Sequence, residues 1–360
     1  METIQDSIES REKIIEYLSS GKVVIMPSDS VYTINTNLFN NEAIKKLYMM
    51  KERDTIGPMS VYVYNWAMAR VLTELNEIET EIVETITNKF WPGPLTIIVS
   101  SNSSYISPYY ILNGTISLEC PEHEIPRYVL EYNEMPLLTA TANKENGIHS
   151  ICGEHINKYF NTVSDIAFIN SSTSPKYGIR NTIIKVKNNE ITIIRNGIIT
   201  EKDIMTECKL NDLDITVHHD LKDEPPYEDS KVSVLATFIQ GGPIDKDIER
   251  NSLERPIELY FNNSIFVDFG KRNENLKRLC AGYVDLSEKD DIKEALFNIN
   301  NVFHQLEDIR CKNIIFFNFY KSKDGVFKTL YDIILRYCKG KELFIPLPMN
   351  LISDEELVEL

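Results

Sequence analysis

Basic residues are scarce in this chain of 360 residues. It carries 38 lysines and arginines against 54 aspartates and glutamates, which gives a formal net charge of −16 at pH 7. The phosphates of nucleic acids and anionic lipids would repel such a chain, so its charge argues against non-specific binding to either. A local group of cations that binds a nucleotide is still compatible with this composition.

Cysteine is also sparse, and long apolar runs are missing. The six cysteines form no CxxC pair, which argues against a zinc ribbon or a redox motif, and scattered cysteines are typical of reduced intracellular proteins. No apolar run approaches the ~20 residues that span a bilayer, and residues 1–18 have no apolar core of a secretory signal. We therefore expect a cytoplasmic protein without a membrane partner.

The common catalytic signatures are absent as well. The sequence contains no GxxxxGK[ST], GxGxxG, HExxH or GxSxG, so P-loop, dinucleotide-fold, zincin and hydrolase-elbow assignments have no support. The run His218-His219-Asp220 could ligate a metal, but adjacent histidines in a polar stretch seldom converge on one ion. We expect no metal site built by the protein.

Helical periodicity and short apolar runs do alternate along the chain, without a strict strand–helix rhythm, and this favours an α/β fold with a mixed sheet. We expect helices over 9–19, 42–51, 77–89, 290–308 and 326–338. We expect strands over 23–26, 60–64, 95–100, 115–119, 136–142, 181–187, 191–197, 257–268, 314–319 and 344–347, with 181–187 and 191–197 paired as a hairpin.

Composition shifts near residue 208. The stretch 211–231 is polar, acidic and contains prolines, which is typical of a linker. We therefore predict a first domain over 1–207, a linker over 208–255 that could act as a lid on the active site, and a smaller domain over 256–360.

Polar side chains follow the first predicted strands. Ser28 and Ser30 come directly after the strand 23–26, where they could hydrogen-bond a ligand or cap a helix. Lys51 and Arg53 alternate around Glu52, so in an extended segment they would point to one side and could clamp a polyphosphate. The alternative is a solvated helix end with cations near the negative end of its dipole.

Further along, similar groups follow other predicted strands. FWPGPLT (90–96) predicts a rigid corner and places Thr96 at the start of a strand. The run 136–147 ends a strand in Thr141-Ala142-Asn143, and an asparagine offers a nucleotide both a donor and an acceptor. Thr182 and Arg195 lie in the predicted hairpin.

Taken in order, these stretches resemble the threonylcarbamoyl-AMP synthase family, whose catalytic unit is the YrdC-like domain. The pieces are PSDSVYTI, KERDTIGPMSVYV, FWPGPLTIIV, TAN, NTII and RNG. They cover roughly residues 10–207, and FWPGPLT is the most specific of them, while the ordered set is far less expected by chance than any single member. Residues from 256 onward resemble, more weakly, the small C-terminal domain of two-domain members.

The resemblance implies a YrdC-like twisted mixed sheet with helices and a smaller Rossmann-like C-terminal domain. It also implies a nucleotidyltransferase that converts L-threonine, bicarbonate and ATP, with Mg²⁺, into threonylcarbamoyl-AMP and pyrophosphate. Partner proteins would then transfer the threonylcarbamoyl group to tRNA. Lys51 and Arg53 would be catalytic, holding the triphosphate. The other implied ligands are Thr96, Thr141, Asn143 and Arg195 for ATP, and Ser28, Ser30, Asn181 and Thr182 for threonine.

The chain departs from the family pattern at several positions. Glu119 stands where the family has an arginine that is expected to meet the threonine carboxylate, and a carboxylate there would repel the substrate's own carboxylate. Thr33, Glu52, Tyr62 and Asn181 also differ from the pattern. The alternative to the synthase is therefore a nucleotide- or RNA-binding protein on the same fold that has lost synthesis.

Overall fold

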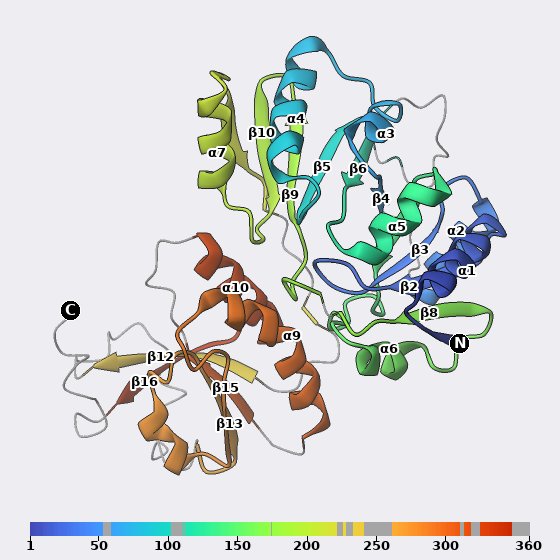
Figure 1. Cartoon of the computed structure of the whole chain (residues 1–360). Coiled ribbons are helices and arrows are strands. Elements are labelled where there is room, and N and C mark those ends of the chain that lie inside the picture. Colours follow the sequence, from blue (N-terminus) through green and yellow to red (C-terminus); the bar gives the residue numbers. More distant parts are fainter. Residues whose placement is uncertain are drawn as a thin grey trace. The chain divides into compact units, whose positions relative to one another are not determined.

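A computed structural model describes residues 1–52, 59–101, 111, 113–173, 175–221, 226–227, 233–240, 261–309, 313–317 and 325–347. The chain divides into two compact units, Met1–Asp223 and Glu224–Leu360 (Figure 1). None of the helices in the described residues combines the length and the apolar character needed to cross a membrane.

Strands and helices interleave in the first unit. Its strands are β1 (Glu2–Gln5), β2 (Val23–Met26), β3 (Thr33–Asn37), β4 (Ser60–Tyr62), β5 (Leu95–Ser100), β6 (Thr115–Glu119), β7 (Leu137–Thr141), β8 (Ile166–Asn170), β9 (Thr182–Lys187), β10 (Glu190–Arg195) and β11 (Thr216–His219). Its helices are α1 (Ile8–Ser19), α2 (Asn41–Met50), α3 (Trp66–Arg70), α4 (Glu77–Phe90), α5 (Glu124–Asn133), α6 (Gly153–Phe160) and α7 (Glu201–Leu210).

The described strands of this unit form one mixed sheet in the order β1-β8-β2-β3-β7-β4-β6-β5-β9-β10-β11. Strands β2 and β3 pair antiparallel, as do β9 and β10, while β4 pairs with β6 and β5 with β9 in parallel. The predicted α/β fold with a mixed sheet is confirmed, and so is the predicted hairpin, which turns between Lys187 and Glu190.

Helices cover both faces of this sheet. Along β2, Val23 and Ile25 pack in an apolar cluster with α2, α4, α6 and α7, whereas Val24 and Met26 pack with α1 and α5. Successive side chains of a strand point to opposite faces, which explains why a strand buried on both sides is apolar throughout. Tyr62 lies in the cluster on the α1 and α5 face.

The second unit is smaller. It contains β12 (Ser233–Gln240), β13 (Ser264–Asp268), a 3₁₀ helix η2 (Glu274–Leu279), β14 (Gly282–Asp285), α9 (Ile292–Asp308), β15 (Asn313–Phe317), α10 (Gly325–Tyr337) and β16 (Glu342–Leu347). Its described strands form a parallel sheet in the order β14-β13-β15-β12-β16. In a Rossmann sheet the first strand lies between the second and the fourth, whereas here β15 separates β12 from β13.

Two predicted segments can be compared with described structure in this part of the chain. The predicted linker 208–255 contains β11, which pairs with β10, and β12, which lies in the second sheet. Strand β11 is mostly exposed, so its polar composition resembled a linker. Of the strand predicted over 257–268, residues 257–260 lie outside the described residues, a turn occupies residues 262–263, and β13 spans Ser264–Asp268. The domain boundaries and the lid stay predictions.

Candidate active site

The predicted site residues lie in three groups of the first unit, each joined by hydrogen bonds. Lys51 joins Thr141 and Asn143 in the first group, and Thr96 joins Asn181 and Arg195 in the second, with Thr182 beside them. Ser28 and Ser30 form the third. Arg53 lies outside the described residues, so its predicted role stays a prediction.

Lys51 is the buried cation of the first group. Its side chain is 6% exposed, and its Nζ donates hydrogen bonds to Thr141 O at 2.8 Å, Asn143 O at 2.8 Å and Asn143 Oδ1 at 2.7 Å. The residue is the C-cap of α2 with helical dihedrals, and Glu52 follows with φ +54°. Neither an extended segment nor a solvated helix end therefore describes Lys51, because tertiary contacts with β7 bury the end of the helix.

The same contacts shape the turn after β7. Thr141 Oγ1 donates to Asn143 Oδ1 at 2.7 Å, Asn143 Nδ2 donates to Gly147 O at 2.5 Å, and Glu145 N donates to Lys51 O at 2.9 Å. A lysine ammonium has three hydrogens to donate, and three close acceptors surround the one on Lys51. Lys51 thus fixes residues 141–147 and supplies a buried positive charge beside them.

The second group forms around Glu119. Thr96 Oγ1 donates to Glu119 Oε1 at 2.8 Å, Asn181 Nδ2 donates to Glu119 Oε2 at 3.1 Å, and Arg195 Nε donates to Asn181 O at 2.9 Å. Burial raises the pKa of Glu119, while hydrogen bonds from Ser60 and Thr96 and the charge of Arg195 act in the opposite direction. Both carboxyl oxygens of Glu119 therefore have donors within the protein.

A tight corner places Thr96 beside Glu119. The Trp91–Pro92 peptide is cis, Trp91 Nε1 donates to Leu95 O at 2.9 Å, and Gly93 N donates to Cys120 O at 2.9 Å. A Cβ on Gly93 would lie 2.5 Å from a backbone oxygen of α4, so only glycine fits there. The corner joins the start of β5 to the end of β6, where Thr96 and Glu119 are direct partners.

The hydroxyl group of Thr182 forms a hydrogen bond within the protein. The residue is 1% exposed, and its hydroxyl donates to Ile199 O at 2.7 Å. Gly197 approaches so closely that a Cβ on it would lie 2.4 Å from Thr182 N. In this arrangement Thr182 holds the turn after β10 against the start of β9, and its predicted contact with threonine stays a prediction.

The third group follows β2. Ser28 Oγ lies 3.1 Å from Ser30 Oγ and donates to Val31 O at 2.8 Å. The Tyr62 hydroxyl is hydrogen-bonded to Ser28 and Thr33, and burial together with the charge of Glu119 raises its pKa. Tyr62 is also the direct partner of Glu119 on the neighbouring strands β4 and β6, so it links the third group to the second.

Asp29, between the two serines, was not among the predicted site residues. It is 4% exposed, its Oδ1 accepts a bond from Glu122 N at 3.2 Å, and its Oδ2 has no hydrogen-bond partner among the described residues. Burial, assisted by the charges of Glu119 and Glu122, raises the pKa of Asp29 to about 7. A carboxylate between two serines at a strand exit was the available sequence signal.

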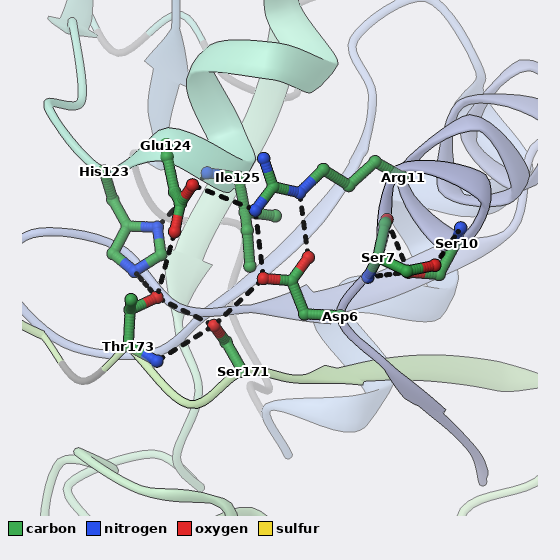
Figure 2. A network of polar contacts seen from close by, with 9 residues as sticks. All are labelled: Asp6, Ser7, Ser10, Arg11, His123, Glu124, Ile125, Ser171 and Thr173. Atoms are coloured by element: carbon green, nitrogen blue, oxygen red, sulfur yellow. Dashed lines mark hydrogen bonds and ion pairs between the residues drawn. The ribbon is translucent and has the colours of Figure 1, made fainter.

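A polar network lies next to the segment that contacts Asp29. Figure 2 shows Arg11 paired with both Asp6, at 2.8 Å, and Glu124, at 3.1 Å. The same network continues through Ser171 and Thr173 to the His123 ring, whose Nε2 lies 3.2 Å from Thr173 Oγ1. It thus joins the starts of α1 and α5 to the segment after β8. It contacts His123 and Glu124, directly after Glu122, whose backbone N–H donates to Asp29.

The histidine pair lies elsewhere in this unit. His219 Nε2 lies 2.9 Å from Glu201 Oε2, and His218 Nε2 lies 4.0 Å from Glu190 Oε1. Neighbouring side chains of a strand point apart, and the described residues contain no group of three or more histidine, cysteine, aspartate or glutamate side chains able to hold a metal ion.

Comparison with known proteins identifies the domain that carries these groups. The Sua5/YciO/YrdC family, described as "Telomere recombination", matches residues 16–197, just over half of the chain. The chain belongs to this family. Every predicted site residue of the Sua5/YciO/YrdC domain lies inside the matched range, and the predicted resemblance to a YrdC-like domain is confirmed.

Relatives match over the same part of the chain. A putative threonylcarbamoyl-AMP synthase from Methanocaldococcus jannaschii is 30% identical over 195 residues, 53% of this chain and 89% of the relative. Threonylcarbamoyl-AMP synthases from Pyrococcus abyssi and Bacillus subtilis are 26% and 25% identical, and the matched part spans 52% and 53% of their lengths. This chain thus matches only about half the length of the latter two relatives.

Solved structures extend the similarity to both units. A variant of P. abyssi Sua5 superimposes with a TM-score of 0.77 at 16% identity, covering 97% of this chain and 99% of the other. P. abyssi Sua5 complexed with L-threonine gives 0.75 at 16% identity, covering 96% and 99%. At this identity the likeness establishes the fold, a YrdC-like domain with a smaller C-terminal sheet domain.

Proposed function

We propose that this protein is a threonylcarbamoyl-AMP synthase. It joins L-threonine, bicarbonate and ATP into threonylcarbamoyl-AMP and releases pyrophosphate, the first step of threonylcarbamoyladenosine formation in tRNA. The observation that carries the proposal is the family match over residues 16–197, which contains every predicted site residue. The names of the relatives and the threonine complex of P. abyssi Sua5 support it.

The proposed roles follow the three groups. Lys51 contributes positive charge next to Thr141 and Asn143, where the triphosphate of ATP binds, and Arg53 adds to it. Thr96 and Arg195 complete the ATP contacts, while Ser28, Ser30, Asn181 and Thr182 bind threonine. Because three acceptors already surround Lys51 Nζ, contact with a phosphate oxygen requires it to exchange one of them. Catalysis then depends on positioning and electrostatics.

Magnesium enters with ATP in this proposal. Mg²⁺ usually keeps several waters and binds substrate phosphates with one or two carboxylates. The described residues offer no group of three or more histidine, cysteine, aspartate or glutamate side chains that could hold a metal ion, so the triphosphate and water would supply most of its ligands. Its chemistry is the neutralisation of phosphate charge. Separate proteins that act on tRNA would consume the product.

The test is pyrophosphate release from the full chain with ATP, Mg²⁺, bicarbonate and each amino acid in turn. Release that requires both L-threonine and bicarbonate supports the synthase, and release with another amino acid revises the substrate. Glu119 alone favours a second candidate, a nucleotide-binding protein without synthesis. Binding of ATP without pyrophosphate release in any of these mixtures would establish that candidate instead.

A further inference from the structure

Asp29 Oδ2 is a buried oxygen atom that the fold leaves unused. The side chain is 4% exposed, and Oδ2 has no hydrogen-bond partner among the described residues. A buried acceptor without a donor destabilises the folded state, so the position calls for a donor that the described residues do not supply. The backbone is held firmly, because Tyr177 N donates to Asp29 O at 2.9 Å.

The other two carboxyl groups near Asp29 are already bonded. Glu119 accepts from Thr96 at 2.8 Å and from Asn181 at 3.1 Å. Glu122 accepts from Lys176 Nζ, which lies 2.9 Å from each of its oxygens. Among these three carboxyl groups, Asp29 alone keeps an oxygen without a donor in the described residues.

The surroundings of Asp29 also oppose its negative charge. The titratable groups that face it are Glu119 on β6, Cys120 and Glu122 after β6, Tyr62 on β4 and Tyr177 on the segment before β9. Of the cations that contact these groups, Lys176 is paired with Glu122, and Arg127 donates to Tyr64 O and to Cys120 Sγ. Burial and the two glutamates therefore raise the pKa of Asp29 to about 7.

The reaction proposed above needs a group with this behaviour. An amino acid enters largely as an ammonium ion, because its α-amino group keeps its proton at neutral pH, and an ammonium nitrogen has no lone pair with which to attack carbon. A general base is most effective when its pKa lies near the working pH. A neighbouring negative charge also stabilises a buried ammonium ion.

We propose that Asp29 is the general base that takes a proton from the substrate ammonium, and that Glu119 is a positioning residue that sets the pH range in which it does so. The inference rests on the proposed function. One N–H bond of R–NH₃⁺ breaks, its electron pair stays on nitrogen, and the proton moves to Asp29 Oδ2, giving R–NH₂ and a neutral carboxylic acid. The free amine and bicarbonate then give the carbamate R–NH–COO⁻ and water.

The first experiment measures L-threonine-dependent pyrophosphate release against pH for the wild type, Asp29→Asn, Glu119→Gln and Asp212→Asn. The exposed Asp212 beyond α7 provides the matched control, and its variant should behave as wild type. Asp29→Asn should release pyrophosphate about 100-fold more slowly near pH 7. The deficit should shrink towards about pH 9, because solvent then supplies the free amine.

Glu119→Gln tests whether the charge of Glu119 sets the pKa of Asp29. The wild-type rate should rise with pH up to a plateau above about 7, because only ionised Asp29 accepts a proton. Removing the neighbouring charge lowers the pKa of Asp29, so this rise should move to lower pH in Glu119→Gln. Wild-type rates and an unchanged pH profile in Asp29→Asn would overturn the role of Asp29 as general base. An unshifted profile in Glu119→Gln would overturn the role of Glu119 in setting the pKa of Asp29.

A second measurement keeps the inference separate from the proposed function. In protein labelled with ¹³C-aspartate, the Cγ signal missing from Asp29→Asn identifies Asp29, and its titration midpoint should lie near 7 and fall in Glu119→Gln. An ordinary midpoint of about 4 would overturn the proposal even in an active enzyme. If the wild type released no pyrophosphate with any amino acid, the proposed function would fail. If the wild type and Asp29→Asn released it equally fast, only the role of Asp29 as general base would be overturned.

Discussion

Asp29 and Asp268 are both buried aspartates at the exit of a buried strand, one in each unit, yet their carboxyl groups are bonded differently. Asp268 is 0% exposed, and its Oδ2 accepts from Asn273 N at 2.7 Å and from Tyr283 Oη at 2.7 Å, while its Oδ1 accepts from Asn273 Nδ2 at 3.1 Å. Asp29 has one longer bond, at 3.2 Å, and an oxygen with no partner in the described residues.

Burial raises the pKa of both carboxyl groups, so their pKa shifts alone do not distinguish them. The bonding does. The donors around Asp268 fix the turn that follows β13, as expected of a structural carboxyl group. Buried polar groups are nearly always satisfied, and each exception needs a reason. The comparison therefore predicts that substitutions at Asp268 lower stability, whereas Asp29→Asn lowers activity without lowering stability.

Lys51 could break this comparison, because it is buried and well bonded and is still proposed to be catalytic. We expect Lys51→Ala to lower pyrophosphate release at least about 100-fold, through loss of the charge beside the triphosphate. We also expect a loss of roughly 2 kcal/mol in the free energy of unfolding, because three acceptors lose a charged donor.

Release assays and urea denaturation of Lys51→Ala measure these two effects. The matched control is Lys45→Ala, since Lys45 lies on the exposed side of α2 and pairs with Glu42. Undiminished release in Lys51→Ala would remove Lys51 from the mechanism. Lost release at full stability would show that its bonds to Thr141 and Asn143 contribute little to the fold.

Asp268→Ala tests the structural half of the comparison. Truncation leaves the donors of Asn273 and Tyr283 without their acceptor, at a cost of about 3 kcal/mol. Amide hydrogen exchange of β13 and β14 reports this loss locally, whereas Glu288→Ala should leave protection unchanged, because the pair that Glu288 forms with Lys271 is exposed. Unchanged protection in Asp268→Ala would remove the structural role assigned to this carboxyl group.

Periodicity predicted much of the framework. The helices expected over 9–19, 42–51 and 77–89 and the strands expected over 23–26, 95–100 and 115–119 agree with the structure to within one residue at each end. These segments are apolar on the faces that they bury. Strand β3 was missed because its sequence, TINTN, is polar, although Thr33, Asn35 and Thr36 are buried.

The site was only partly predictable from the sequence. Strand exits indicated Ser28, Thr141 and Asn143, because ligands of α/β proteins bind there. Sequence spacing could not show that Glu119 lies close enough to raise the pKa of Asp29, since the two belong to segments ninety residues apart. It also could not show that Lys51 is buried, which depends on contacts between α2 and the turn after β7.

Asp29→Asn sharpens the comparison through stability rather than activity. An ordinary aspartate has a pKa of about 4, and in the folded protein that of Asp29 is raised to about 7. Between these values the folded state keeps a proton that the unfolded state has lost. The free energy of unfolding of the wild type should therefore fall as pH rises across this window, and no further above it.

The amide does not titrate, so Asp29→Asn should lack this loss. We expect the variant to be more stable than the wild type by roughly 4 kcal/mol near pH 8 and equal to it near pH 4. Urea denaturation of the two proteins across this range measures the difference. A variant less stable than the wild type near pH 8 would mean that ionised Asp29 is satisfied in the folded state.

Tyr283→Phe removes one donor from Asp268 and leaves the rest of its shell in place. Asp268 raises the pKa of Tyr283 further, after burial, and the hydroxyl–carboxyl bond of 2.7 Å should contribute about 1 kcal/mol. The two bonds from Asn273 remain, so the loss in β13 protection should be about a third of that in Asp268→Ala. An equal loss in both variants would mean that Tyr283 alone keeps this carboxyl group buried. Asp268 would then depend on a single donor, and its difference from Asp29 would rest on that one hydrogen bond.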